Sequence, residues 1–137
     1  MTDTKNVSCC LLKLPNGKFV FQRRTKDAPV EAYKLDLFGG HIEIREGALH
    51  ALRREIAEET SLDVKHIKVH RIGTFRSQDS PPIELHSYLA HITKPDFKVF
   101  EGLREEVYGL DEVLARSDVD PHTRLILEKY REAEAVE

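Results

Sequence analysis

Residues 40–62 read GHIEIREGALHALRREIAEETSL, and this stretch decides the fold. The spacing of its apolar residues predicts a helix over about residues 47–60, because a helix advances about 100° per residue and Leu49, Leu52 and Ile56 then share one face. Three carboxylates fan out beside that apolar face: Glu55, Glu58 and Glu59. The predicted helix therefore carries a row of glutamates along the border of its buried side.

These three glutamates repel one another unless a cation lies among them. Glu55 lies three residues before Glu58 and four before Glu59, and like charges at these separations oppose a helix by roughly 0.2–0.5 kcal/mol per pair. Clusters of carboxylate oxygens suit Mg²⁺ or Mn²⁺, so the pattern predicts a divalent metal site. For this fragment alone, a solvated helix face with an Arg54–Glu58 ion pair is the plainer interpretation.

The residues before the helix complete a longer pattern. Gly40 lies six residues before Glu46, and Glu46 lies eight before Arg54, which opens an Arg-Glu-apolar-any-Glu-Glu run. This spacing resembles the Nudix box, in which glycine, five residues, glutamate and seven residues precede Arg-Glu-apolar-any-Glu-Glu-any-Gly-apolar. Glu46 is expected to support the loop or the start of the helix. Ser61 departs from the pattern, because it stands where the family has its last glycine. We expect that glycine to be left-handed, and serine would then cost about 1 kcal/mol.

The resemblance implies a fold as well as a site. It is an α/β fold, the Nudix α/β/α sandwich with a central mixed sheet, and we expect one domain over residues 1–137. Short apolar segments predict the strands and amphipathic segments predict the helices. The strands are expected at residues 7–14, 18–24, 35–38, 67–76 and 83–92, and the helices at residues 47–60, 110–116 and 122–135.

The resemblance further implies a metal-dependent hydrolase that cleaves a diphosphate bond in a nucleoside triphosphate or another nucleoside diphosphate-linked compound. A divalent metal such as Mg²⁺ or Mn²⁺ masks phosphate charge and orients water in such reactions. Glu55 and Glu59 lie one helical turn apart and are the expected ligands, with Glu58 as a further ligand or as the base that activates water. In relatives the main-chain carbonyl at the position of Gly40 helps to hold the metal. Arg54 is expected to orient a neighbouring glutamate, so Glu58, Glu55 and Arg54 form the expected catalytic set.

Residues outside the box supply the candidates for substrate binding. Arg23, Arg24 and Lys34 precede the box and carry positive charge that substrate phosphates need. Relatives often add an acidic residue from a later loop, and Glu105 is our candidate for that position. The alternatives in the same acidic segment are Glu101 and Glu106.

Two other functions compete with hydrolysis. Gln22-Arg23-Arg24-Thr25 faintly resembles the isopentenyl-diphosphate isomerase branch of the same fold, but that branch uses a cysteine in the strand before its box, and Cys9 and Cys10 lie far upstream. A nucleotide-binding module that lost its chemistry is the third class. The intact glutamates argue against such a module, because their mutual repulsion would have no compensation there.

Composition limits the partners. The formal charge of −3 argues against a surface for nucleic-acid polymers, whereas a small nucleotide needs only a few local cations. No apolar run approaches the roughly 20 residues that span a bilayer, and residues 1–6 lack the pattern of a signal peptide. We therefore expect a cytoplasmic protein without membrane contact. A homodimer is a further expectation, since dimers are common among relatives.

Overall fold

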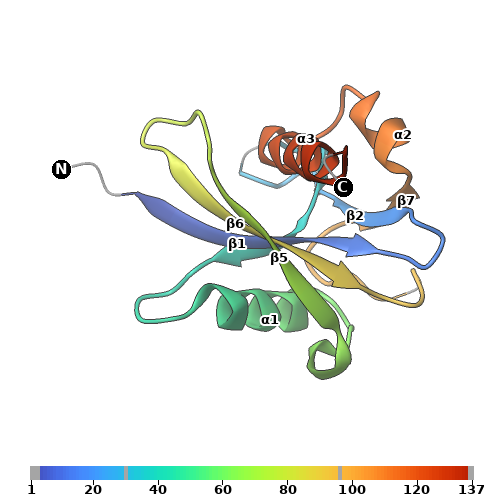
Figure 1. Ribbon diagram of the computed structural model, residues 1–137, viewed down its shortest axis with the longest axis horizontal. Helices are drawn as coiled ribbons and strands as arrows, with labels where there is room; N and C mark the ends of the chain where they lie inside the picture. The colour runs from blue at the N-terminus through green and yellow to red at the C-terminus, as the bar shows by residue number, and fades with distance from the viewer. Residues whose placement is uncertain (1–3, 30, 96, 136–137) are drawn as a thin grey trace.

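A mixed sheet with helices on both faces organises the chain (Figure 1). The structure is a computed structural model that describes residues 4–29, 31–95 and 97–135. The elements in this part of the chain are β1 Lys5–Lys13, β2 Phe19–Arg23, β3 Leu35–Asp36, β4 Phe38–His41, α1 Ala48–Glu59, the 3-10 helix η1 Val64–His66, β5 Lys68–Arg76, β6 Ile83–His91, β7 Arg104–Tyr108, α2 Leu110–Leu114 and α3 Pro121–Ala135.

Strand β1 is the centre of the sheet. It pairs in parallel with β6 along its whole length on one edge, and β5 follows β6 in antiparallel pairing. On the other edge its first half pairs with β4, through Val7 to Cys10, and its end pairs with β2, through Leu12 and Lys13. Because β4 and β2 share one edge of β1, they diverge from each other, and β3 and β7 extend the β2 side.

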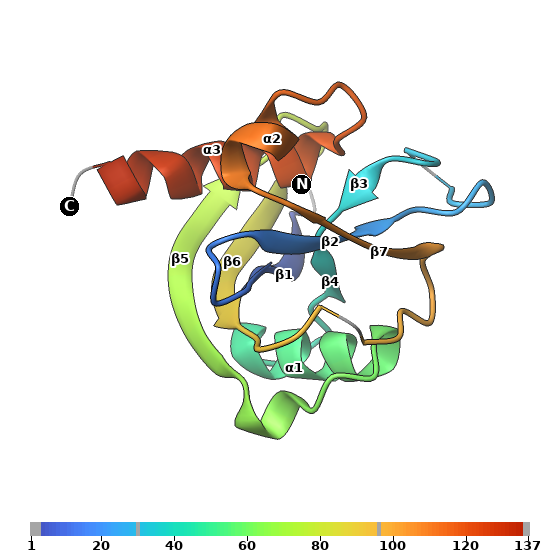
Figure 2. The same cartoon turned by 90° about the vertical axis from the view of Figure 1, so that its right-hand side faces the viewer.

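Two hydrophobic cores fill the two faces of the sheet. On one face, side chains such as Leu11, Phe21 and Leu127 pack between the sheet and α3, together with Cys9. On the other face, side chains such as Phe38, Leu52 and Ile56 pack between the sheet and α1, together with Cys10. Successive strand residues point to opposite faces, so β1 contributes to both cores. The expected α/β/α sandwich with a central mixed sheet is confirmed (Figures 1 and 2).

Four expectations from the sequence need correction. The segment 35–38 is not one strand, because β3 pairs with β2 whereas β4 pairs with β1. Strand β7 was not expected at all. Leu49 is 42% exposed, and the buried side of α1 instead includes Ala51, Leu52, Ile56 and Glu59. The serine after the helix is not left-handed: among the described residues other than glycine, positive φ occurs only at Glu31, Tyr33 and Arg45.

Candidate active site

The two glycines of β4 bring its backbone against the carboxylates of α1. Gly39 has a φ of +146°, and a Cβ there would lie 2.0 Å from the main-chain oxygen of Ser8. A Cβ on Gly40 would lie 2.4 Å from the carboxylate carbon of Glu55. Only glycine fits both positions, so the close approach of β4 and α1 is set by this pair.

A guanidinium clamp fixes the carboxylate of Glu55. Arg54 donates from Nε and Nη2 to both oxygens of Glu46, at 2.7 and 2.9 Å, and from Nη1 to Glu55 Oε1 at 2.9 Å. It also donates to the main-chain oxygen of His41 at 3.1 Å. The hydrogen bonds from Arg54 lower the pKa of Glu46 to about 2. Such bidentate, charge-assisted contacts are short and directional, so Glu46 holds Arg54 and Arg54 holds Glu55.

Glu59 is held in a different way, by neutral donors. Its side chain is buried, with the residue only 3% exposed. The side-chain amide of Gln22 donates to Oε2 at 2.8 Å, and the main-chain N–H of Gly39 donates to Oε1 at 3.1 Å. Burial raises the pKa of Glu59 to about 8, and the nearby Glu101 and Glu55 act in the same direction. A cation would be needed to keep this carboxylate charged at neutral pH.

A cavity of about 390 Å³ opens beside Glu59, between the diverging strands β2 and β4. Its lining includes Gln22, Arg24, Asp36, Gly39, Glu59 and Glu101. Most of these side chains are polar and charges of both signs are present, which suits a charged ligand such as a phosphate. We place the candidate active site here, because this cavity contains the buried carboxylate of α1.

Two charged residues line the part of this cavity that lies away from α1. Arg24 brings a positive charge and Asp36 brings a carboxyl group. Arg24 Nη2 lies 2.8 Å from Asp36 Oδ2 and 3.8 Å from Asp120 Oδ1. Asp36 also accepts hydrogen bonds from the main-chain N–H of Leu37 and the hydroxyl of Thr123. Burial and the neighbouring Asp120 raise the pKa of Asp36 to about 6. The guanidinium of Arg24 is thus positioned at the cavity by two carboxylates.

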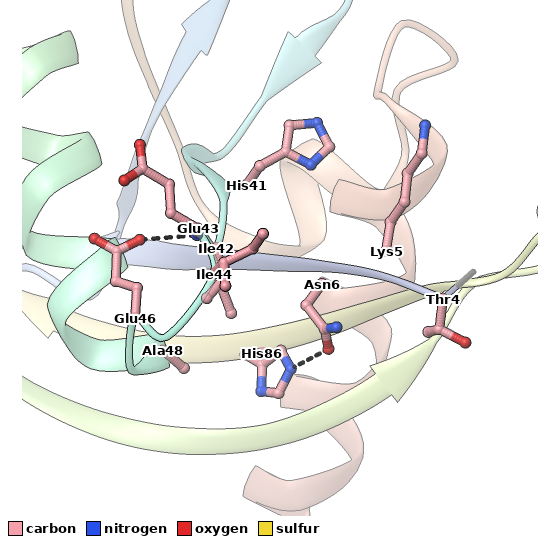
Figure 3. Close-up of a pocket in the computed structure, with 10 residues that line it drawn as sticks. All are labelled: Thr4, Lys5, Asn6, His41, Ile42, Glu43, Ile44, Glu46, Ala48 and His86. Carbon is pink, nitrogen blue, oxygen red and sulfur yellow. Dashed lines mark hydrogen bonds between the residues drawn. The ribbon is translucent and has the colours of Figure 1, made fainter.

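A larger cavity of about 550 Å³ lies at the start of α1 (Figure 3). Figure 3 shows His86 hydrogen-bonded to Asn6, with the side chains of Lys5 and His41 pointing away from that pair. The glutamates Glu55, Glu58 and Glu59 are not among its lining residues. Its size alone therefore does not make it the reaction site.

The structure brings some of the expected site residues together. Gly40, Glu55 and Arg54 are in contact through the packing and hydrogen bonds described above, and Glu59 adjoins Gly39. Glu58 lies at the outer side of this group, with its side chain 54% exposed and 3.4 Å from Arg54 Nη1. Arg24 lines the cavity, as the sequence suggested for a phosphate ligand.

Three residues that were expected to contact the substrate, Arg23, Lys34 and Glu105, do not line this cavity. Arg23 points to the opposite face of β2 from Gln22, where it binds Glu106 at 2.7 Å and Asp118 at 2.8 Å in a largely buried cluster. Lys34 does not line the cavity. Glu105 is paired with Gln22 across β2 and β7 and so shares its face of the sheet, but Glu101 is the residue of this acidic segment that lines the cavity.

Sequence reasoning missed the two neutral donors to Glu59. Gln22 is the one polar residue among the first four of β2, which read FVFQ, and this isolated polar residue was the available signal. The main-chain N–H of Gly39 left no signal of its own, because only the pairing of β4 with β1 places it beside Glu59. Both donors come from residues distant in sequence from the helix.

The comparisons with known proteins agree with this fold. The model of the NUDIX domain family matches residues 3–130, and no curated protein gave a significant match. The MutT protein of Methanosarcina mazei Go1 is a similar structure, with a TM-score of 0.83, 18% identity, and 97% of this chain and 96% of that chain covered. The E. coli ORF135 protein follows with a TM-score of 0.78, 21% identity, and 98% and 94% covered.

A third similar structure is the NUDIX domain of Shewanella oneidensis NrtR, solved in complex with ADP ribose. Its TM-score is 0.77 at 17% identity, with 98% of this chain and 90% of that chain covered.

In the described part of the chain, no helix has the length and apolar character that crossing a bilayer requires. Nearly the whole chain matches the family model, and box residues 40–62 lie inside the matched range 3–130. The chain therefore belongs to the NUDIX family and is classed with the Nudix hydrolases.

Proposed function

We propose that the protein hydrolyses a diphosphate bond in a nucleoside triphosphate or another nucleoside diphosphate-linked compound, with Mg²⁺ or Mn²⁺ as the metal. The observation that carries the proposal is the juxtaposition of Glu55 and Glu59 beside the glycine pair of β4, each held by its own hydrogen bonds, with Glu59 lining a polar cavity.

The donor set fits a hard divalent cation. Glu55 and Glu59 would supply carboxylate oxygens and Gly40 a main-chain oxygen, which are ligands that Mg²⁺ and Mn²⁺ accept. Among the described residues, no three acidic, histidine or cysteine side chains form a ready metal cluster. Water and substrate phosphates would therefore complete the coordination, as is usual for Mg²⁺. A bound metal would mask phosphate charge and stabilise charge on the leaving oxygen.

The protein's own residues have separate tasks in this scheme. Arg54 fixes the orientation of the Glu55 carboxylate through the Glu46 clamp. Glu58 is exposed at the outer side of the group, where its carboxylate has access to water and would take a proton from the attacking molecule. Arg24, positioned by Asp36, would contact the substrate phosphates. Glu101 would add a carboxylate next to Glu59.

Support for the substrate class comes from the cavity and from one structural neighbour. The cavity lining is mostly polar and includes the guanidinium of Arg24, which suits a phosphorylated ligand. The neighbouring NrtR domain was solved with ADP ribose, a nucleoside diphosphate linked to a sugar. A small nucleotide is therefore the ligand that we propose, and cytoplasmic location and homodimer formation remain proposals based on the resemblance.

The isomerase alternative has little support in the structure. Neither Cys9 nor Cys10 lines the cavity beside Glu59. Both thiols are buried in the two hydrophobic cores, and burial raises their pKa. Thiols in such surroundings are poor acid or base catalysts.

The test is a turnover screen with and without metal. The panel holds standard and oxidised nucleoside triphosphates, dinucleoside polyphosphates, sugar nucleotides, ADP-ribose and isopentenyl diphosphate. We expect metal-dependent release of phosphate or pyrophosphate from at least one nucleotide, with losses of at least about 100-fold in Glu55→Gln and Glu59→Gln. Glu128→Gln, an exposed change on α3, is the matched control. Full activity in both site variants would refute the assignment, and tight nucleotide binding without turnover would indicate the binding module.

A further inference from the structure

The end of α1 is joined to the segment between β6 and β7 by a short ladder of hydrogen bonds. The main-chain N–H of Ser61 donates to Lys98 O at 3.0 Å, and that of Phe100 donates to Glu59 O at 2.7 Å. Thr60 and Val99 form the antiparallel bridge between them. Figure 2 shows this segment passing beside α1 on its way to β7.

The next hydrogen bond of this ladder is accepted by a side chain. In a regular antiparallel pair, Ser61 and Lys98 would exchange both main-chain hydrogen bonds, so that Lys98 N–H would donate to Ser61 O. Instead Lys98 N–H donates to the hydroxyl oxygen of Ser61 at 2.8 Å. The chain already turns away here, since Leu62 N–H donates to Thr60 Oγ1 at 3.2 Å. Glycine, which the family pattern has at this position, has no oxygen to accept this bond.

The segment that Ser61 holds leads directly into the candidate active site. Glu101 and Gly102 line the cavity with Glu59. On the far side of this pair, Leu103 N–H donates to Arg23 O at 2.8 Å, and a Cβ on Gly102 would lie 2.9 Å from Gln22 Oε1. The segment is therefore tied to β2 at one end and to the end of α1 at the other, with Glu101 between the two ties.

We propose that Ser61 is a positioning residue whose hydroxyl secures residues 98–100 against the end of α1 and so keeps the carboxylate of Glu101 beside Glu59. The proposal rests on the proposed function, because Glu101 contributes only if the cavity holds a metal and phosphates. It assigns a role to the one box position at which this chain departs from the family pattern.

The experiment compares Ser61→Ala, Ser61→Thr, Glu101→Gln and the double variant Ser61→Ala/Glu101→Gln in the full chain. Mn²⁺ affinity is measured by calorimetry without substrate, and the exchange rate of the Lys98 amide hydrogen is measured by NMR. Loss of one hydrogen bond predicts an Mn²⁺ affinity about 3- to 10-fold weaker in Ser61→Ala. Ser61→Thr keeps the hydroxyl and is expected to bind Mn²⁺ like the wild type.

The double variant separates positioning from general stability. If Ser61 acts through Glu101, adding Ser61→Ala to Glu101→Gln causes no further loss of Mn²⁺ affinity. If the two losses multiply, or if Ser61→Ala binds Mn²⁺ as the wild type does, the proposal is wrong. Unchanged exchange of the Lys98 amide in Ser61→Ala would also overturn it.

These readouts do not depend on turnover. If no nucleotide is hydrolysed, the proposed function fails, yet the Mn²⁺ titration and the amide exchange still decide the role of Ser61. A wild-type chain that does not bind Mn²⁺ overturns both. Once a substrate is identified, activity gives a further readout. Ser61→Ala should raise the Mn²⁺ concentration needed for half-maximal activity about 3- to 10-fold, as for the binding affinity, with little change in the rate at saturating metal.

Discussion

Gly40 and Glu55 occupy adjoining space: a Cβ on Gly40 would lie 2.4 Å from the Glu55 carboxylate carbon and 2.6 Å from each of its oxygens. The absence of a side chain at Gly40, the first glycine of the box, therefore leaves the space that the carboxylate of Glu55 occupies. Strand β4 and helix α1 meet at this point, and the contact leaves no room for a side chain at Gly40 while Glu55 keeps its position.

Replacing Gly40 by alanine should displace Glu55 more than it disturbs the fold. The clash involves the end of a side chain that can rotate away, so we expect metal affinity to fall by at least about tenfold with a small change in melting temperature. Gly47→Ala is the control, because a Cβ there meets nothing within 4 Å. Calorimetric Mn²⁺ titrations of the two variants provide the measurement, and equal affinities would contradict the assignment of Glu55.

Removing the charge of Glu46 should impair catalysis although Glu46 is not an expected ligand. In Glu46→Gln the Nε and Nη2 atoms of Arg54 no longer meet an anionic acceptor, so the guanidinium of Arg54 holds the carboxylate of Glu55 less firmly. We expect kcat to fall about tenfold with little change in KM, as for other residues that orient a metal ligand. His50→Ala is the matched control, since His50 also contacts Glu46 Oε2 at 2.9 Å but is largely exposed. Steady-state kinetics on the first substrate found would show whether only the Arg54 contact matters.

The helix and its carboxylates could be predicted because they depend on local periodicity. The helix was expected at residues 47–60 and is found at Ala48–Glu59. Leu52 and Ile56 pack against the sheet as expected, but the third residue of that face is Ala48, and Leu49 is exposed. Ala48 and Leu49 lie four and three residues before Leu52, so both have helical spacing to it, and only the position of the sheet decides between them.

Contacts across the sheet could not be predicted in the same way. Strand β7 reads REEVY, and its charged residues resembled a solvated loop. Its register with β2 places Glu106 on the face where Arg23 is buried, so the charges are paired rather than solvated. Gln22 likewise meets Glu59 only because β2 and β4 pair with different parts of β1 and diverge from each other. These contacts require the three-dimensional pairing of strands far apart in the chain.

Metal binding should release a proton near neutral pH. Glu59 has a pKa of about 8 in the metal-free protein, so at pH 7 most molecules carry the proton that coordination must displace. Calorimetry in two buffers of different ionisation enthalpy should show release of close to one proton at pH 6–7 and almost none above about pH 9. In Glu59→Gln this release should be absent. Equal release in that variant would assign the proton to another group.

The same shift predicts how metal-free stability depends on pH. The pKa of Glu59 rises from 4.5 to about 8 on folding, so between these values the unfolded chain binds fewer protons than the folded one. The free energy of unfolding should therefore fall as pH rises from about 4.5 to 8. Denaturant titrations with a chelator present should show a smaller decrease in Glu59→Gln. A steeper decrease in that variant would be inconsistent with the burial of this carboxylate.

Arg23, the last residue of β2, and Arg24, which directly follows the strand, should give opposite phenotypes because their side chains lie on opposite sides of the sheet. Arg23 is buried against Glu106 and Asp118, and Arg23→Met would remove the cation that these two carboxylates share, leaving Arg104 beside Glu106 and Arg116 beside Asp118. Breaking a buried pair costs about 3–5 kcal/mol when the remaining charge has no other partner. Because Arg104 and Arg116 stay in place, we expect a loss of stability of about 1–3 kcal/mol, with near-normal kinetics in the molecules that remain folded. Arg24→Gln should instead raise KM by about tenfold through lost phosphate contact, with a smaller loss of stability. Urea unfolding and steady-state kinetics on both variants would reveal the contrast, and it would be reversed if Arg23 were the residue that binds phosphate.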